Sequence, residues 1–351
     1  MIDRRLFLTA LWAWLALAPA FGQTLKVTEM PQQSVDVALG QYSGITWISG
    51  NQYAVVDDKL PGGGIVFFDI PIRSDGKVRE SQVQMTVPDA TLSASVAGLD
   101  NEGVVFSRGK LYVSAEGDQS IREYDLEGRA TGTVFSIPAD LGAKAIVKNG
   151  GFEAFTWNAA TGQFWTTTEL PLKADGKASR LHRLQRFDER CLANGRWLYR
   201  MDEPVLSEKE RGSVMAYVHG ISAMTALDDG RLIILEREVY VPAGKPRDIL
   251  ARSFTKTKLY VVNPSGDPAE ILPKQLLCDF ETRLVMTAAG IDVALANYEG
   301  MCLGPRLPDG RRCLILIADS QAGMASLATS IGRKQLTREF LKVLLLEGEG
   351  I

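Results

Sequence analysis

Eight acidic residues stand at the ends of a repeated motif, and their type and spacing point to chemistry. The clearest copy runs from Glu102 to Glu116, where two apolar runs flank the turn Arg108-Gly109-Lys110. A strand–turn–strand of this kind brings its two end residues to the same edge of a sheet. The motif therefore predicts a β-hairpin with a pair of carboxylates at one edge.

The same motif recurs over residues 43–57, 153–169, 222–236 and 299–319. Ser43 and Ser222 replace the opening acid in two of these copies. The interval from the turn glycine to the closing acid is seven residues in the first three copies, six in the fourth and nine in the fifth, so the last two alignments are looser. The acids at the repeat ends are Asp57, Glu102, Glu116, Glu153, Glu169, Glu236, Glu299 and Asp319.

Hairpins repeated at intervals of roughly 50 to 80 residues are typical of a propeller. We therefore expect an all-β fold, a β-propeller of five or six blades, with residues 24–39 completing the last blade and residues 334–346 forming the strand that closes the ring. An inserted loop is predicted over residues 237–258. If the hairpins are the inner strands, their acids gather around one mouth of the central channel.

Residues 1–22 have the pattern of a secretory signal rather than of a folded element. Arg4-Arg5 precedes an apolar run and then small residues, which is the twin-arginine pattern. A transmembrane anchor is the alternative, but the apolar run is short for a span. We expect residues 23–351 to form a single domain that is periplasmic or secreted, has no membrane span and is monomeric.

Composition narrows the partners and the redox chemistry. The formal net charge is -3 and no stripe of Lys and Arg with interleaved aromatics occurs, so we expect no nucleic-acid partner. Cys302 and Cys313 fall on opposite strands of the last hairpin, where they form either a disulfide or two buried free thiols. No CxxC occurs, which argues against a metal site built on sulfur.

Carboxylates gathered at one mouth repel one another unless they are protonated or neutralised by a cation. Calcium accepts six to eight oxygen ligands, so a calcium site is predicted, with Asp57, Glu116, Glu169, Glu236 and Asp319 as candidate ligands. The alternative is that the acids are structural and accept hydrogen bonds from the neighbouring blade. The chain has only two histidines, which argues against an imidazole metal site and against a Ser-His-Asp hydrolase.

Two further residues lie close to the repeat ends. His219 stands beside the start of the fourth copy and either faces the channel or is a satisfied structural residue. Arg237 follows Glu236, and its guanidinium either clamps a phosphate or pairs with an acid of a neighbouring blade.

Several segments in order carry a resemblance to a known family. They are Asn101-Glu102-Gly103, Asn149-Gly150-Gly151-Phe152-Glu153-Ala154, Gly220-Ile221-Ser222, Leu235-Glu236-Arg237, Asn297-Tyr298-Glu299-Gly300 and Ala318-Asp319-Ser320. From about residue 42 to residue 319 the chain resembles the phytase-like esterase domain family, which comprises exported bacterial proteins of the β-propeller type. Calcium-dependent propeller phytases are similar in architecture only.

The resemblance implies hydrolysis of a small-molecule phosphate ester. It implies that Glu102, Glu153 or Glu299 is the catalytic carboxylate that holds or deprotonates the attacking water, and that Arg237 and His219 contact the substrate. The alternative function is that of a non-catalytic propeller that binds a ligand or a protein partner. A phosphate site predicts that Arg237 converges with one or two of Lys59, Arg122 and Lys148.

Overall fold

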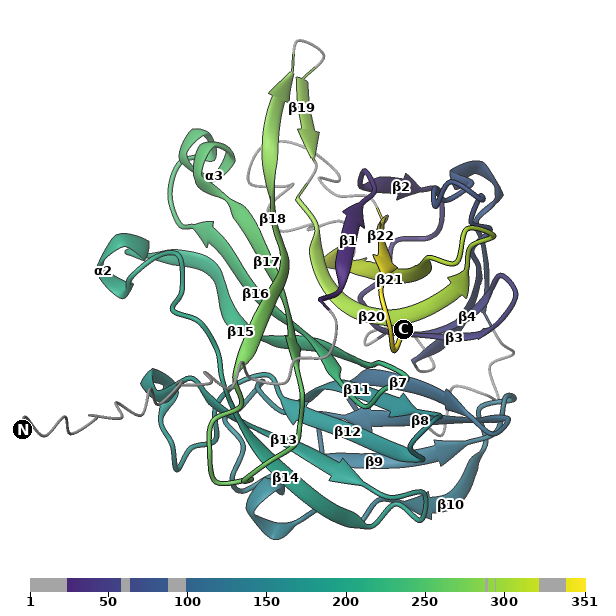
Figure 1. The fold of residues 1–351 in the computed structure, drawn as a ribbon. Coiled ribbons are helices and arrows are strands. Elements are labelled where there is room, and N and C mark those ends of the chain that lie inside the picture. The colour runs from purple at the N-terminus through teal and green to yellow at the C-terminus, as the bar shows by residue number, and fades with distance from the viewer. Residues whose placement is uncertain (1–23, 58–63, 88–98, 288–289, 294, 322–338) are drawn as a thin grey trace, which may run out of the picture.

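The computed structural model describes residues 24–57, 64–87, 99–287, 290–293, 295–321 and 339–351. The predicted signal segment and Lys59 lie outside these residues. Five antiparallel sheets stand around a common axis as the blades of a propeller (Figure 1). The predicted all-β propeller is therefore confirmed, with five blades in the described part of the chain.

Each blade begins with a hairpin of the repeat. Blade 1 consists of β3 (Tyr42–Ser49), β4 (Gln52–Asp57), β5 (Ile65–Asp69) and β6 (Gln84–Thr86). Blade 2 consists of β7 (Asn101–Ser107), β8 (Lys110–Ala115), β9 (Ser120–Tyr124) and β10 (Ala130–Val134). Blade 3 consists of β11 (Phe152–Asn158), β12 (Gln163–Thr168), β13 (Leu181–Phe187) and β14 (Ala193–Arg200). Blade 4 consists of β15 (Val214–Ala226), β16 (Leu232–Pro242), β17 (Phe254–Val262), β18 (Lys274–Thr287) and β19 (Gly290–Val293).

Blade 5 joins the two ends of the chain. It consists of β20 (Asn297–Arg306), β21 (Arg312–Asp319), β22 (Glu339–Glu347) and β1 (Lys26–Glu29), with β2 (Gln33–Val35) also pairing with β22. Lys26 lies opposite Glu347, and Gln33 lies opposite Leu341. The N-terminal segment therefore completes the last blade, and β22 is the closing strand, as the sequence predicts.

The first strands of the five blades contact one another in a closed ring around the axis. The turn glycines of all five hairpins have positive φ, from 53° at Gly50 to 94° at Gly230, which a glycine adopts without strain. This explains why a glycine marks each copy of the repeat. The ring puts equivalent positions of the five hairpins side by side.

The core is divided into apolar layers between adjacent blades. Tyr42 and Val55 of blade 1 pack with Ile315 and Val343 of blade 5, and comparable clusters lie between the other neighbouring pairs. Because neighbouring blades cover both faces of the inner strands, the sequences of these strands need not alternate between apolar and polar residues. In β16, for example, every residue is buried.

Blade 4 corrects one prediction. In place of an inserted loop over residues 237–258, β16 continues to Pro242, a helix α3 (Pro246–Arg252) follows, and β17 begins at Phe254. The β-branched and aromatic residues around Tyr240 favour a strand, and the Pro and Gly limit only the turn. Figure 1 shows β18 and β19 projecting from the ring as a ribbon.

The remaining helices are short. They are α2 (Glu208–Arg211) and the 3₁₀ turns at Glu80–Gln82, Ala139–Leu141 and Lys177–Ser179. None of the helices in the described residues has the length and apolar character needed to cross a bilayer. All four cysteines are free, and Cys302 and Cys313 are buried thiols, so the second alternative for this pair is observed.

Candidate functional site

The opening positions of the repeat lie at β-bulges. In every blade the pairing of the first two strands shifts register at this position, where the inner strand has one residue more than its partner. These residues are Ser43, Glu102, Glu153, Ser222 and Glu299, and all five are buried. A bulge re-aims a side chain, and here it gathers these groups near the axis.

A small residue follows each bulge because the inner strands approach closely. A Cβ on Gly44 would lie 2.3 Å from the backbone oxygen of Glu102, and one on Gly103 would lie 2.9 Å from that of Glu153. The channel at this level holds a cavity of only about 10 Å³, lined in part by Ser43, Glu153, Ser222 and Glu299. That space is about the size of one water molecule, so a substrate does not fit there.

Strand pairing also shows which residues occupy the closing position. The residue before each bulge pairs with Asp57, Ala115, Thr168, Glu236 or Ala318. The next residue along is Glu116, Glu169 or Asp319 in blades 2, 3 and 5, and it is Arg237 in blade 4. Relative to the bulge, Asp57 and Glu236 therefore stand one residue earlier along the second strand than Glu116, Glu169 and Asp319 do. The repeat alignment predicted from the sequence is wrong by one position for these two acids.

Arg237 is the centre of a buried charged layer. Its Nη2 donates to Glu169 Oε1 at 2.6 Å, and its Nη1 donates to Glu299 and to Asn297 Oδ1. Burial opposes its charge, but Glu299 and Glu169 outweigh burial and hold the pKa of Arg237 well above its usual value. Of the two predicted alternatives, the structure shows the second: Arg237 pairs with acids of neighbouring blades.

The remaining acids of this layer hold their protons more tightly than usual. Burial, Glu102 and Glu169 raise the pKa of Glu153 well above its usual value. Burial and Glu299 do the same for Asp319, which accepts hydrogen bonds from the backbone and side chain of Gln321. The layer therefore carries less negative charge than its formal count.

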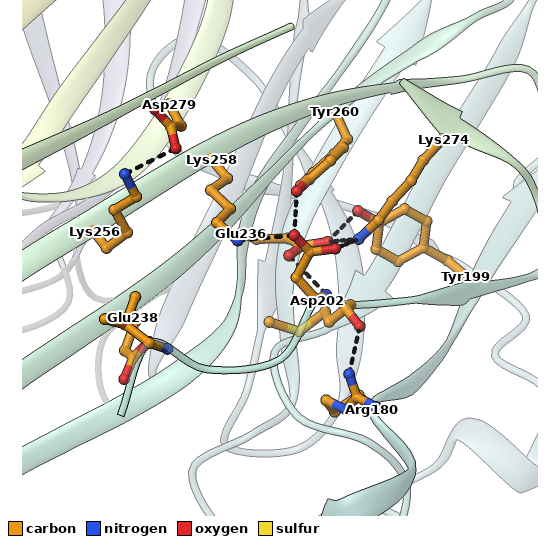
Figure 2. Close-up of polar contacts among 12 residues, drawn as sticks. Arg180, Tyr199, Asp202, Glu236, Glu238, Lys256, Lys258, Tyr260, Lys274 and Asp279 are labelled. Atoms are coloured by element: carbon orange, nitrogen blue, oxygen red, sulfur yellow. Dashed lines mark hydrogen bonds and ion pairs between the residues drawn. The ribbon is translucent and has the colours of Figure 1, made fainter. Parts of the chain in front are cut away.

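Glu236 belongs to a separate network between blades 3 and 4. Figure 2 shows its carboxylate among Tyr199, Lys274 and Asp202. Lys274 Nζ lies 2.6 Å from Glu236 Oε1, the amide of Asp202 donates to Oε2 at 3.0 Å, and the Tyr199 hydroxyl donates as well. This is a fully paired brace rather than part of the layer around Arg237.

His219 lies beside this network and not in the charged layer. It stands opposite Glu238, and burial and the nearby Arg180 and Lys258 lower its pKa to about 4. The imidazole is therefore neutral at neutral pH. Asp57 lies between blades 1 and 5, where it contributes with burial to the raised pKa of Glu339.

A second acidic group lies in blade 2, where β7 begins and β8 ends. Ligand oxygens of Asp100, Glu102 and Glu116 all lie within 4.8 Å of one another. Asp100 precedes β7 and its carbonyl accepts the amide of Glu116 at 2.7 Å, while Glu116 Oε1 accepts the amide of Gly151 at 2.6 Å. Burial raises the pKa of Glu116 despite that bond.

Two members of this acidic triad line a cavity of about 360 Å³. Asp100 and Glu116 line it together with Gln119, Asn149 and the two lysines Lys148 and Lys173. Asp100, Gln119 and Asn149 all have positive φ, between 52° and 56°. Non-glycine residues held in this region gather at functional sites, because the surrounding structure must enforce them.

Gln119 supplies a further oxygen beside the triad. Its Nε2 donates to the carbonyl of Glu116 at 2.9 Å, whereas its Oε1 is buried with no hydrogen-bond partner among the described residues. A Cβ on Gly151 would lie 1.8 Å from this amide, so a side chain at this position would displace Gln119. Carboxylate and amide oxygens without sulfur or imidazole suit a hard divalent cation.

The basic residues predicted to converge at a phosphate site do not lie together in the described part of the chain. Lys148 lines the cavity, while Arg122 pairs with Asp118 at 2.5 Å and Arg237 is enclosed in the charged layer. Sequence reasoning placed Glu102 and Glu116 together correctly but missed Asp100 and Gln119. The signal for Asp100 is an acid two residues before Glu102, which alternation puts near the same edge.

Several solved structures are similar to this chain at low sequence identity. The chain is similar to a streptogramin B lyase (10% identity, 92% of this chain and 98% of that one, TM-score 0.36) and to a member of the duf4221 family from Bacteroides vulgatus (8%, 92% and 98%, TM-score 0.42). It is also similar to the PQQ-bound aldose sugar dehydrogenase of Streptomyces coelicolor (11%, 92% and 99%, TM-score 0.39). A search of curated proteins gave no match.

A family model covers most of the described propeller. The phytase-like model, described as esterase-like activity of phytase, matches residues 37–321, which contain every copy of the repeat and both acidic groups. The chain therefore belongs to the phytase-like family.

Proposed function

We propose that this protein hydrolyses phosphate esters at the cavity lined by Asp100 and Glu116, with a divalent cation, calcium, as its cofactor. The observation that carries the proposal is that two acids of the triad, Asp100 and Glu116, line one cavity with Gln119, whose Oε1 has no hydrogen-bond partner among the described residues. The family description supports the reaction class. If residues 1–22 act as an export signal, the reaction takes place in the periplasm or outside the cell.

The donor set fits the cation. Asp100, Glu102 and Glu116 would hold it, with Gln119 Oε1 as a neutral fourth oxygen. When bound, the cation supplies a Lewis acid for the phosphoryl oxygens and lowers the pKa of a coordinated water. Calcium takes oxygen ligands in flexible geometry, which suits a set drawn from two turns.

The other residues of the cavity bind and orient the ester. Lys148 and Lys173 also line the cavity, and their positive charges would attract phosphoryl oxygens. A bound cation would keep Glu116 ionised against the burial that raises its pKa. The bond from Gly151 fixes the orientation of this carboxylate.

Glu102, Glu153 and Glu299 receive different roles in this proposal. Glu102 belongs to the triad, whereas Glu153 and Glu299 face a space of about 10 Å³. We assign the latter two, together with Glu169, Arg237 and Asp319, to bracing the ring, and Glu236 and His219 to the neighbouring network. The same features favour a second candidate function, a non-catalytic propeller that binds a ligand at the cavity.

The test is phosphate release by purified residues 23–351 from phytate and simple monoesters, with calcium added or chelated. We expect calcium-dependent release that falls at least about 100-fold in Asp100→Asn and Glu116→Gln, as for loss of a metal ligand. Asp118→Asn is the matched control, because this nearby acid pairs with Arg122 outside the triad.

Three outcomes separate the alternatives. Release that survives chelation and both substitutions would place the chemistry elsewhere. No release from any ester, with calcium raising the melting temperature of the unmodified chain but not of Asp100→Asn, would leave the binding function. If calcium changed neither phosphate release nor the melting temperature, calcium would be excluded as a ligand of this site.

A further inference from the structure

The channel has a second cavity at the end opposite the charged layer. Its volume is about 150 Å³, and inner-strand residues of all five blades line it. Trp47, Phe106 and Trp157 give it an aromatic wall, and Asn158 and Thr225 add polar groups. The narrow level at Glu153 and Glu299 separates this cavity from the opposite mouth.

Arg312 lines this cavity and differs from the other arginines beside it. Its Cζ lies 5.3 Å from the centre of the Trp47 ring, and its Nε is buried with no hydrogen-bond partner among the described residues. No ion pair to Arg312 is formed within the described part of the chain. Burial, assisted by Arg306, lowers the pKa of Arg312.

The neighbouring cations are already paired. Arg108 lies over the Trp157 ring at 5.4 Å and forms an ion pair with Glu189, and Arg306 lies 3.7 Å from Asp228. Asp228 also lines the cavity, but Arg306 and Arg312 together outnumber it. Arg306 and Arg312 therefore share one neighbouring acid, Asp228, and the ion pair of Asp228 is formed with Arg306.

A half-buried guanidinium that forms no ion pair among the described residues is costly unless a ligand supplies one. We propose that this cavity binds a small organic monoanion, a carboxylate on a planar or apolar body about the size of benzene. A cavity of about 150 Å³ holds a molecule of that size. The carboxylate would accept hydrogen bonds from the Arg312 guanidinium, and the body would pack against Trp47, Phe106 and Trp157.

The proposal is independent of phosphate ester hydrolysis, because it concerns the other end of the channel. Benzoate is the anionic probe and benzamide its neutral counterpart of the same shape. Binding is followed by calorimetry and by tryptophan fluorescence, since Trp47 and Trp157 lie in the cavity wall. We expect benzoate to bind saturably and benzamide to bind at least about ten-fold more weakly, which corresponds to one lost charge-assisted hydrogen bond.

Arg312→Gln should weaken benzoate binding at least about ten-fold, as loss of the charge predicts. Arg311→Gln is the matched control, because Arg311 is adjacent but pairs with Asp309 outside the cavity. Ala159→Leu narrows the cavity from an exposed turn position without disturbing the core, and it decides the question if Arg312→Gln does not fold.

Absence of saturable benzoate binding at millimolar concentration would overturn the proposal. Equal binding of benzoate and benzamide would also overturn it, because the site would then not select a charge. Binding left unchanged in both Arg312→Gln and Ala159→Leu would place the probe elsewhere on the protein and would be equally decisive.

Discussion

Arg237 offers the sharpest test of the charged layer. Its side chain is 5% exposed and neutralises Glu169 and Glu299, which are 6% and 9% exposed. Arg237→Met preserves the length and most of the volume of the side chain but leaves two buried carboxylates without a cation. Breaking a buried ion pair costs about 3–5 kcal/mol, which corresponds to a fall in melting temperature of about 4–7 °C for a chain of this size.

The loss should depend on pH. Burial already raises the pKa of Glu169, and Arg237 opposes that shift. Without Arg237 the folded variant holds a proton on this carboxyl to higher pH than the unfolded chain does, so its stability is present below about pH 4.3 and falls as pH rises. The slope is at most about 1.4 kcal/mol per pH unit for each carboxyl group, so the variant should resemble the unmodified chain most closely at acidic pH.

The assay is denaturation of both proteins at about pH 5 and about pH 8, within the window of that titration. Arg129→Met is the control, because Arg129 forms an exposed pair with Asp125 and should show no pH-dependent difference. Adding Glu169→Gln and Glu299→Gln to Arg237→Met should recover part of the loss. Equal midpoints for Arg237→Met and Arg129→Met at both pH values would refute the reasoning.

Two further predictions concern buried carboxylates between blades. Burial and Asp57 raise the pKa of Glu339 to about 7, so the stability linked to this proton is present at acidic pH and is lost as pH rises through about 7. Glu339→Gln should therefore flatten the pH dependence of the free energy of unfolding measured by urea titration. An unchanged dependence would assign the proton to another group. Lys274→Met leaves Glu236, whose side chain is 3% exposed, without its cation and should lower the free energy of unfolding by about 2–4 kcal/mol. Lys256→Met breaks the more exposed pair with Asp279 and should lower it by less than about 1 kcal/mol. Similar losses for the two variants would contradict the role of Glu236 as a buried brace.

The architecture could be predicted because its signals are local. Each hairpin has its own alternating apolar residues and its own turn glycine, as at Gly109 and Gly162, and repetition of that unit implies a ring. The length of β16 was missed because Pro242 and Pro246 resemble the start of a loop, whereas the strand is set by pairing with β15 and β17.

The content of the charged layer was only partly predictable. Counting from a turn glycine assumes that the glycine has the same place in every turn, but Gly50 lies two residues before the first paired residue of β4 and Gly162 only one residue before that of β12. A shift of one residue moves a side chain to the other face of a strand, which is why Glu236 lies in the network with Lys274 and Arg237 lies with the acids. Only strand pairing reveals that an arginine occupies an acidic position.

The triad was missed in part because its added members lie outside the repeat. Asp100 and Gln119 flank the strands of blade 2 in positive-φ conformations that no periodic pattern encodes. Their meeting with Glu116 depends on the turn at Gly151 of the next blade, which is a tertiary contact.

The joining of both chain ends in blade 5 has a consequence for biosynthesis. As the ribosome releases the polypeptide from its N-terminus, β1 and β2 emerge first but have no partner until β22 has been made. Glu299 also emerges late, so a nascent chain of four blades has Arg237 beside Glu169 while the second carboxylate is still missing. The ring and its innermost ion pairs are therefore completed together, at the end of translation.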